Sequence, residues 1–140
     1  MLPRLDLRVL LAVFAGGALG TLARAGLEEA FAHDPASWPW ATFAVNVAGA
    51  ALLALAITRL PSRHRSAHVR AFAGPGLCGG LTTFSTFQLE LVRMLDADRV
   101  GLALGYAAAS VAAGLAAAAL ATRLASARRA TPDVPARERA

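Results

Sequence analysis

The side chains of this protein that are able to do chemistry are few, and most of them lie within long apolar stretches. Asn46 sits near the middle of one stretch, with Thr42 one helical turn earlier on the same face. Tyr106 and Ser110 are four residues apart in another stretch and therefore share a helix face. The 3 histidines fall in predicted loops and are too scattered for a metal site. Because these groups include no nucleophile–base pair, the sequence predicts a protein that is not an enzyme.

The composition indicates the surroundings of these groups. Hydrophobic residues make up 56% of the 140 residues, and charged residues make up only 16%, against roughly 25% in soluble domains. The net charge of +5 and the pI near 11.2 are, taken alone, typical of nucleic-acid binding. However, so short a chain has too little interior to bury this much apolar surface. The composition therefore predicts contact with membrane lipid and no nucleic-acid partner.

Four stretches without charged residues define the expected helices: 9–23, 35–58, 71–89 and 100–122. Crossing a bilayer takes about 20 apolar residues, so the first stretch crosses only if its helix continues through Arg24 towards Leu27. A cleaved signal peptide is the alternative for this stretch, and the three stretches that follow disfavour it. We expect a four-helix transmembrane domain over residues 1–125 and a disordered cytoplasmic tail over residues 126–140.

The arginines predict the orientation of these helices. All 14 basic residues are arginine, and 11 of them lie in the N-terminal segment, the second loop and the C-terminal segment. Only Arg24, Arg93 and Arg99 lie on the other side. By the positive-inside rule this bias places both termini in the cytoplasm. We therefore expect a multi-pass protein of the cytoplasmic (inner) membrane.

The third stretch differs from the others in its poor helix propensity. Residues 74–87 read GPGLCGGLTTFSTF, with four glycines, a proline and two adjacent threonines. Unwound backbone at membrane depth must be shielded from lipid, and such breaks commonly use their carbonyls to hold a cation. A kinked helix with Ser and Thr bonded to its own turns is an equally open alternative. Elsewhere, paired glycines such as Gly16 and Gly20, and Gly101 and Gly105, predict close helix packing.

The groups within the expected helices favour an anion. No acidic residue lies in the four charge-free stretches, and Glu90 is counted among the loop charges. Phe84 and Phe87 share one helix face, and their ring edges are electropositive. Amide and hydroxyl donors, with Arg24 at a helix end, add positive potential. Simple packing is the alternative, with Asn46 joining helices and the two phenylalanines filling a seam.

The sequence resembles the Fluc (CrcB) family of fluoride channels. The resemblance rests on Gly17-x-x-Gly20-x-x-x-Arg24, Asn46-x-x-Gly49, the string GGLTTFSTF over residues 79–87, and Tyr106 with Ser110. It extends over all four expected helices, and the TTFSTF string is its most specific part.

The resemblance implies an all-α membrane protein with four transmembrane helices per subunit, a broken third helix and an antiparallel dimer. It also implies two separate fluoride pores and a structural Na⁺ at the dimer interface, held by the backbone carbonyls of Gly79 and Thr82. The Asn46 amide would donate to fluoride, and Phe84 and Phe87 from opposite subunits would form the aromatic part of each pore.

The same resemblance implies roles for the remaining polar residues. Tyr106 and Ser110 would continue the polar track, Thr42 would add a hydroxyl, and Arg24 would lie near the pore vestibule. Two features depart from the family pattern: the polar track lapses at Gly114 and Ala118, and the arginine bias is steep for homodimers that insert in both orientations. An oppositely oriented paralogue is therefore a possible second subunit, in place of an identical one.

The sequence thus predicts a fluoride-selective channel that passively exports fluoride and gives fluoride resistance. The alternative is a small-multidrug-type four-helix exporter, which is disfavoured because proton coupling needs a buried carboxylate. A non-transporting membrane subunit explains the glycine pairs and leaves the string in the third stretch unexplained.

Overall fold

Three long apolar helices form most of the protein. The computed structural model describes residues 6–34, 37–60 and 67–127. Its long helices are α1 (Leu7–Ala30), α2 (Trp40–Arg59) and α6 (Val100–Ala127), with mean hydropathies of 1.6, 1.9 and 1.7 in their most apolar windows. Each is long and apolar enough to cross a membrane. The described residues contain no β-strand.

The first helix continues well beyond its charge-free stretch. Asp6 caps it, because the Asp6 carboxylate accepts a hydrogen bond of 2.9 Å from the Arg8 backbone N–H. The helix then runs through Arg24 to Ala30 without interruption. The first charge-free stretch therefore does continue past Leu27, which makes its helix long enough to cross a membrane. At the other end of the chain, α6 continues to Ala127, and the rest of the predicted tail lies outside the described residues.

The third stretch forms a chain of short helical segments with an extended step. Its segments are α3 (Ala67–Ala71), the π-helical segment η2 (Phe72–Cys78), α4 (Gly79–Leu81) and α5 (Phe84–Asp96). Between α4 and α5, Thr82 (φ −79°, ψ 152°) and Thr83 (φ −145°, ψ 125°) are extended. Pro75 and its two neighbouring glycines, where the sequence predicts a poor helix, form a π-helix. The residues that leave the helical conformation are the two threonines. Thr83 then caps α5, because its hydroxyl accepts from the Thr86 N–H at 3.1 Å.

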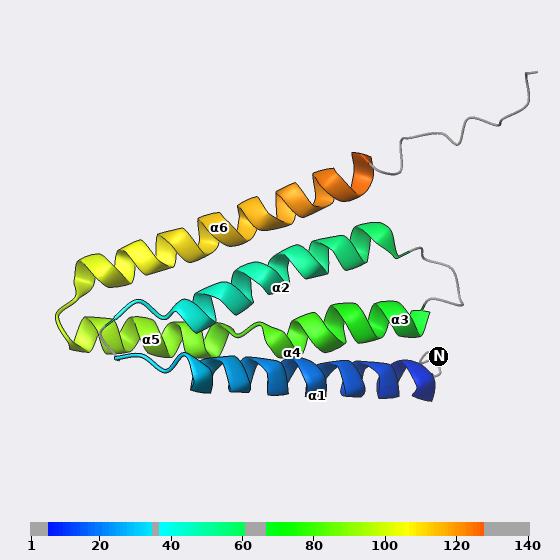
Figure 1. Ribbon diagram of the computed structural model, residues 1–140, viewed down its shortest axis with the longest axis horizontal. Helices are drawn as coiled ribbons and strands as arrows, with labels where there is room; N and C mark the ends of the chain where they lie inside the picture. Colours follow the sequence, from blue (N-terminus) through cyan, green and yellow to red (C-terminus); the bar gives the residue numbers. More distant parts are fainter. Residues whose placement is uncertain (1–5, 35–36, 61–66, 128–140) are drawn as a thin grey trace, which may run out of the picture.

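The helices lie side by side in a fixed order. In Figure 1 the interrupted segment from α3 to α5 runs between α2 and α1, and α6 lies on the far side of α2. Large apolar side chains such as Phe14, Leu22, Leu104 and Leu115 point outward and are more than 65% exposed. Helices that carry such side chains on their outer surface require an apolar solvent.

Glycines bring α1 into backbone contact with η2 and α4. A Cβ added at Gly20 would collide with the Leu77 carbonyl, and one added at Gly16 would collide with the Phe72 carbonyl. This confirms the packing role predicted for that pair. Gly101 and Gly105 have open space at the Cβ position within the described subunit, so the same role is not seen for the α6 pair.

The most buried side chains gather where α5 meets α6. Met94, Ala103 and Tyr106 are almost completely buried there, and Trp38, Phe43, Phe87 and Leu91 pack against them. This cluster fixes α5 relative to α2 and α6, and therefore fixes the position of the chain that follows the extended step.

A single methyl group at Gly20 is expected to destabilise the protein. Gly20→Ala places that methyl against the Leu77 carbonyl, and overpacking of this kind typically costs about 1–3 kcal/mol. The matched control is Gly26→Ala in the same helix, where a Cβ meets nothing within 4 Å and the higher helix propensity of alanine stabilises. Thermal unfolding of both variants in detergent, followed by tryptophan fluorescence, measures the difference. Equal melting temperatures would contradict the packing assignment.

Candidate functional site

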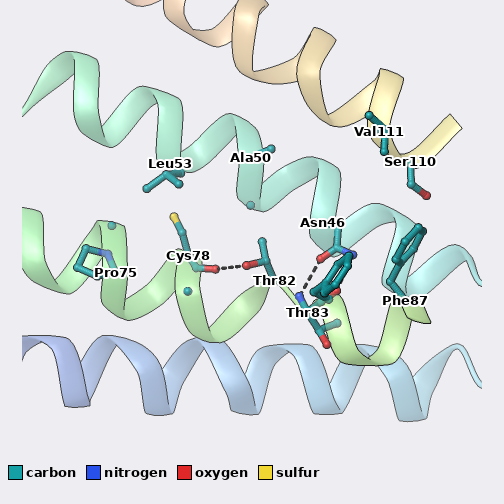
Figure 2. A pocket seen from close by; sticks show the side chains of 14 residues that line it. Asn46, Ala50, Leu53, Pro75, Cys78, Thr82, Thr83, Phe87, Ser110 and Val111 are labelled. Atoms are coloured by element: carbon teal, nitrogen blue, oxygen red, sulfur yellow. Dashed lines mark hydrogen bonds between the residues drawn. The ribbon is translucent and has the colours of Figure 1, made fainter. Parts of the chain in front are cut away.

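The main cavity is an open groove beside the extended step. It has a volume of about 470 Å³ and is bounded by α2, the interrupted segment and α6 (Figure 2). Of the nine predicted pore and Na⁺-site residues, six line the groove: Asn46, Gly79, Thr82, Phe84, Phe87 and Ser110. Arg24, Thr42 and Tyr106 do not line it. The structure therefore divides the predicted residues into a groove set and a set placed elsewhere.

Asn46 is bonded to the backbone of the extended step. Its Nδ2 donates to the Thr83 carbonyl at 3.0 Å, and its Oδ1 accepts from the Thr83 N–H at 2.8 Å. The side-chain amide thus takes the place of the helical partners that Thr83 lacks, as Figure 2 shows. This matches the alternative in which Asn46 joins helices. Because Nδ2 carries two hydrogens, one N–H remains for a ligand in the groove.

The extended step deprives several carbonyls of their helical donors. In a continuous α-helix the Gly79 carbonyl would accept from the Thr83 N–H, which instead bonds Asn46. The Thr82 carbonyl would accept from the Thr86 N–H, which instead bonds the Thr83 hydroxyl. Both the N–H and the hydroxyl of Thr82 donate to the Cys78 carbonyl, at 3.0 and 2.9 Å. The Gly79 and Thr82 carbonyls are therefore released from their usual helical bonds, and both residues line the groove.

Two stacked phenylalanines stand at one end of the groove. The ring centroids of Phe84 and Phe87 are 6.0 Å apart, with 27° between the ring planes. Phe84 is 70% exposed within the subunit. Phe87 also packs against Tyr106, with 5.1 Å between centroids. Phe84 is therefore free to meet another surface, whereas Phe87 links the groove to the buried cluster between α5 and α6.

Glu90 is a buried acid, and its prediction as a loop charge is wrong. The residue is only 4% exposed. Thr42 donates to Glu90 Oε1 at 2.5 Å, and the Tyr106 hydroxyl donates to Oε2 at 2.7 Å. The helical spacing of Phe87, Glu90 and Met94 puts all three on one face of α5, which is the signal that identifies this position. The hydroxyls of Thr42 and Tyr106 consequently serve a carboxylate rather than the groove.

Ser110 keeps an unused hydrogen-bonding group. Among the described residues, two buried side-chain polar atoms lack a partner, the Ser110 Oγ and the Trp38 Nε1. Ser110 lines the groove and Trp38 does not. Buried polar atoms without partners are rare in folded proteins, so the Ser110 hydroxyl is a candidate ligand donor.

Arg24 lies outside the groove lining and bonds two protein groups. Its Nε donates to the Gly80 carbonyl at 3.3 Å, and its terminal nitrogen pairs with Glu28, with a shortest distance of 3.2 Å. Arg24 thus contacts the interrupted segment, and its expected position near a pore vestibule stays a prediction.

The groove combines a few polar groups with apolar walls. Its polar groups are one free N–H of Asn46, the Ser110 hydroxyl, and backbone carbonyls at the step. Among the described residues no cluster of His, Cys, Asp or Glu is able to hold a metal ion. Donors without a nearby carboxylate suit a small anion, whereas the carbonyls suit a hard cation.

A family model and individual relatives both match this chain, and they indicate the same family. Residues 11–122 match the family described as CrcB-like protein, Camphor Resistance (CrcB). The chain is 57% identical over 108 residues to "Fluoride-specific ion channel FluC 1" of Mycolicibacterium paratuberculosis, which covers 76% of this chain and 82% of that protein.

Two further relatives come from one organism, Thermobifida fusca. Its FluC 1 is 47% identical over 98 residues, covering 69% of this chain and 78% of that protein. Its FluC 2 is 44% identical over 106 residues, covering 74% of this chain and 77% of that protein. Both carry the name "Fluoride-specific ion channel".

The matched residues contain α2, the extended step and the whole groove, together with most of α1 and α6. Three membrane-spanning candidates and ion-channel relatives indicate a multi-pass membrane protein. The chain belongs to the CrcB family.

Proposed function

We propose that this protein is a fluoride-selective channel that lets fluoride leave the cell passively across the cytoplasmic membrane and so gives fluoride resistance. The observation that carries the proposal is the high identity to proteins named fluoride-specific ion channels. The family match over residues 11–122 includes every groove residue. Membership in a family of channels also makes the protein a transporter rather than an enzyme.

The groove supports this function through its remaining donors. Fluoride is small and strongly hydrated, so a narrow path must replace its water with close hydrogen-bond donors. The second N–H of Asn46 on α2 and the Ser110 hydroxyl on α6 are such donors, and both residues line the groove. The ring edges of Phe84 and Phe87 add weaker positive potential.

The small-multidrug-type exporter is not excluded by the lack of a buried carboxylate, because Glu90 is buried. This carboxylate accepts hydrogen bonds from Thr42 and Tyr106 and is absent from the groove lining. Family membership now favours the channel, because the relatives are named as channels rather than exporters.

We further propose that the interrupted segment is a single broken crossing, and that two four-helix subunits pair in antiparallel fashion along the groove. Gly79 supports this. Its backbone is helical (φ −65°, ψ −35°) and a Cβ there meets nothing within the subunit, so nothing in one subunit requires glycine. A second copy packed against the groove would require it, and would also cover the exposed Phe84 ring.

A structural Na⁺ fits the same interface. The Gly79 and Thr82 carbonyls have lost their helical donors, and carbonyl oxygens are suitable ligands for a hard cation. These carbonyls from both subunits would hold the ion. When bound, Na⁺ supplies positive charge between the two extended steps and offsets the mutual repulsion of their carbonyl dipoles.

The identity of the second subunit depends on membrane orientation. The arginine bias of 11 to 3 favours one orientation for most copies, whereas an antiparallel pair needs both. A paralogue with reversed loop charges would supply the missing orientation, and Thermobifida fusca carries both a FluC 1 and a FluC 2.

Fluoride efflux from vesicles is expected to depend on the groove residues. Asn46→Asp adds a repelling charge and removes a donor, so it should abolish efflux. Phe84→Ile and Phe87→Ile should each lower efflux about tenfold or more, if each removes interactions comparable to one hydrogen bond to a charged group. Phe14→Ile, at an outward-facing position of α1, is the matched control and should be neutral. An ion-selective electrode measures fluoride and chloride release; comparable chloride efflux from the unmodified protein would contradict the proposal.

Because backbone carbonyls would hold the Na⁺, we expect the site to tolerate a changed side chain at Thr82 but not a larger side chain at Gly79. Thr82→Ser keeps the carbonyl and should be mild, whereas Gly79→Val should lower both dimer content and fluoride efflux. Gly105→Val on α6 is the control, because a Cβ there also meets nothing within the subunit. Dimer content in detergent should fall when N-methyl-glucamine replaces Na⁺. Unchanged dimer content and efflux in that exchange would rule out the site.

Reporter fusions should resolve the orientation of the subunits. We expect a C-terminal reporter that is active only in the cytoplasm to give most of the signal, with a small or absent signal from a reporter active outside. Purified protein in liposomes then tests self-sufficiency. Full efflux from copies held in one orientation would contradict the antiparallel pair.

A further inference from the structure

Arg24 reaches across from α1 to a carbonyl at the end of α4. Its Nε donates to the Gly80 carbonyl at 3.3 Å. In a continuous helix this carbonyl would accept from the Phe84 N–H, but the chain is extended at Thr82 and Thr83. The guanidinium therefore occupies the place of the missing helical donor.

The packing of the two segments makes this contact specific. A Cβ at Gly80 would collide with the Gly17 carbonyl, so α1 and α4 touch backbone to backbone at that point. Gly17 and Arg24 are seven residues apart and lie on the same face of α1. Because Gly17 touches α4, Arg24, which lies two turns further along α1, is placed within reach of the end of α4.

Glu28 fixes the other end of the guanidinium. The terminal nitrogen of Arg24 lies 3.3 and 3.2 Å from the two carboxylate oxygens of Glu28, one turn further along α1. The arginine and glutamate side chains are 22% and 28% exposed. The pair has no net charge, and neither residue lines the groove.

We infer that Arg24 is a positioning residue that holds the Gly80 carbonyl and so fixes the extended step, with Glu28 orienting it, and that it does not act as a charge attracting fluoride. The inference rests on the proposed function only for its flux measurement. It assigns the conformation of the step, and therefore the placement of Thr83 and Asn46 at the groove, partly to a residue outside the groove.

Two variants of Arg24 separate a donor from a charge. In glutamine the amide nitrogen is attached to Cδ, as Nε is in arginine, so Arg24→Gln keeps an N–H opposite the Gly80 carbonyl and loses the charge. Arg24→Lys keeps the charge and places a methylene at the Nε position. Glu28→Gln is added to the glutamine variant so that no unpaired carboxylate remains. Arg24→Met, which has neither donor nor charge, is the negative control.

The flux experiment has opposite outcomes for the two roles. If Arg24 positions the step, Arg24→Gln/Glu28→Gln retains fluoride efflux within about threefold, while Arg24→Lys and Arg24→Met lose about tenfold or more, the size of one lost hydrogen bond to a charged group. The half-saturating fluoride concentration stays unchanged in all of them. A lysine variant that retains efflux while the double glutamine variant loses it, or a raised half-saturating concentration in the neutral variants, would overturn the inference.

Hydrogen exchange of the step tests the same inference without fluoride. Mass spectrometry of peptides spanning residues 82–86 should show faster amide exchange in Arg24→Met and Arg24→Lys, and near-native exchange in the double glutamine variant. Equal exchange in all variants would overturn the positioning role, including where the variants are inactive. If the unmodified protein releases no fluoride, the proposed function fails while this comparison remains valid.

Discussion

A helix that is interrupted in apolar surroundings must find new partners for its backbone, and the rest of this structure depends on that constraint. Unsatisfied N–H and C=O groups are costly where no water reaches them. The step at Thr82 and Thr83 is served by three side chains from outside the usual helical ladder. Asn46 bonds both backbone groups of Thr83, Arg24 bonds the Gly80 carbonyl, and the Thr83 hydroxyl caps α5. The interruption is therefore held by α1 and α2 as well as by its own sequence.

Once the backbone of the step is hydrogen-bonded, a few polar groups still lack partners, and these line the groove. They are an N–H of Asn46, the Ser110 hydroxyl, and the carbonyls of Gly79 and Thr82. Donors and released carbonyls side by side are the arrangement expected if an anion path and a cation site share an interface. The outward-facing Phe84 ring and the open space at Gly79 add an uncovered surface beside them.

The buried acid Glu90 lies outside the groove that these polar groups line. Glu90 accepts from Thr42 and Tyr106, and the Met94 and Ala103 side chains close the same cluster. Two hydrogen bonds satisfy the carboxyl group and join α5 to both α2 and α6. Removing Thr42 or Tyr106 would leave a buried carboxyl oxygen without its donor, so both residues contribute to the placement of α5.

The amino-acid sequence by itself determined the membrane setting, the helix stretches and the family, because hydropathy, helix length and the string over residues 79–87 are local properties. It also indicated a weak third helix, but not that Pro75 would be absorbed in a π-helix and the chain extended at the threonines. Tertiary structure alone decided the partners of Arg24, Asn46 and Glu90. A residue's charge and spacing define what it is able to bond, whereas the carbonyl or carboxylate it meets comes from a helix distant in the sequence, brought close by glycine contacts and by packing between α5 and α6.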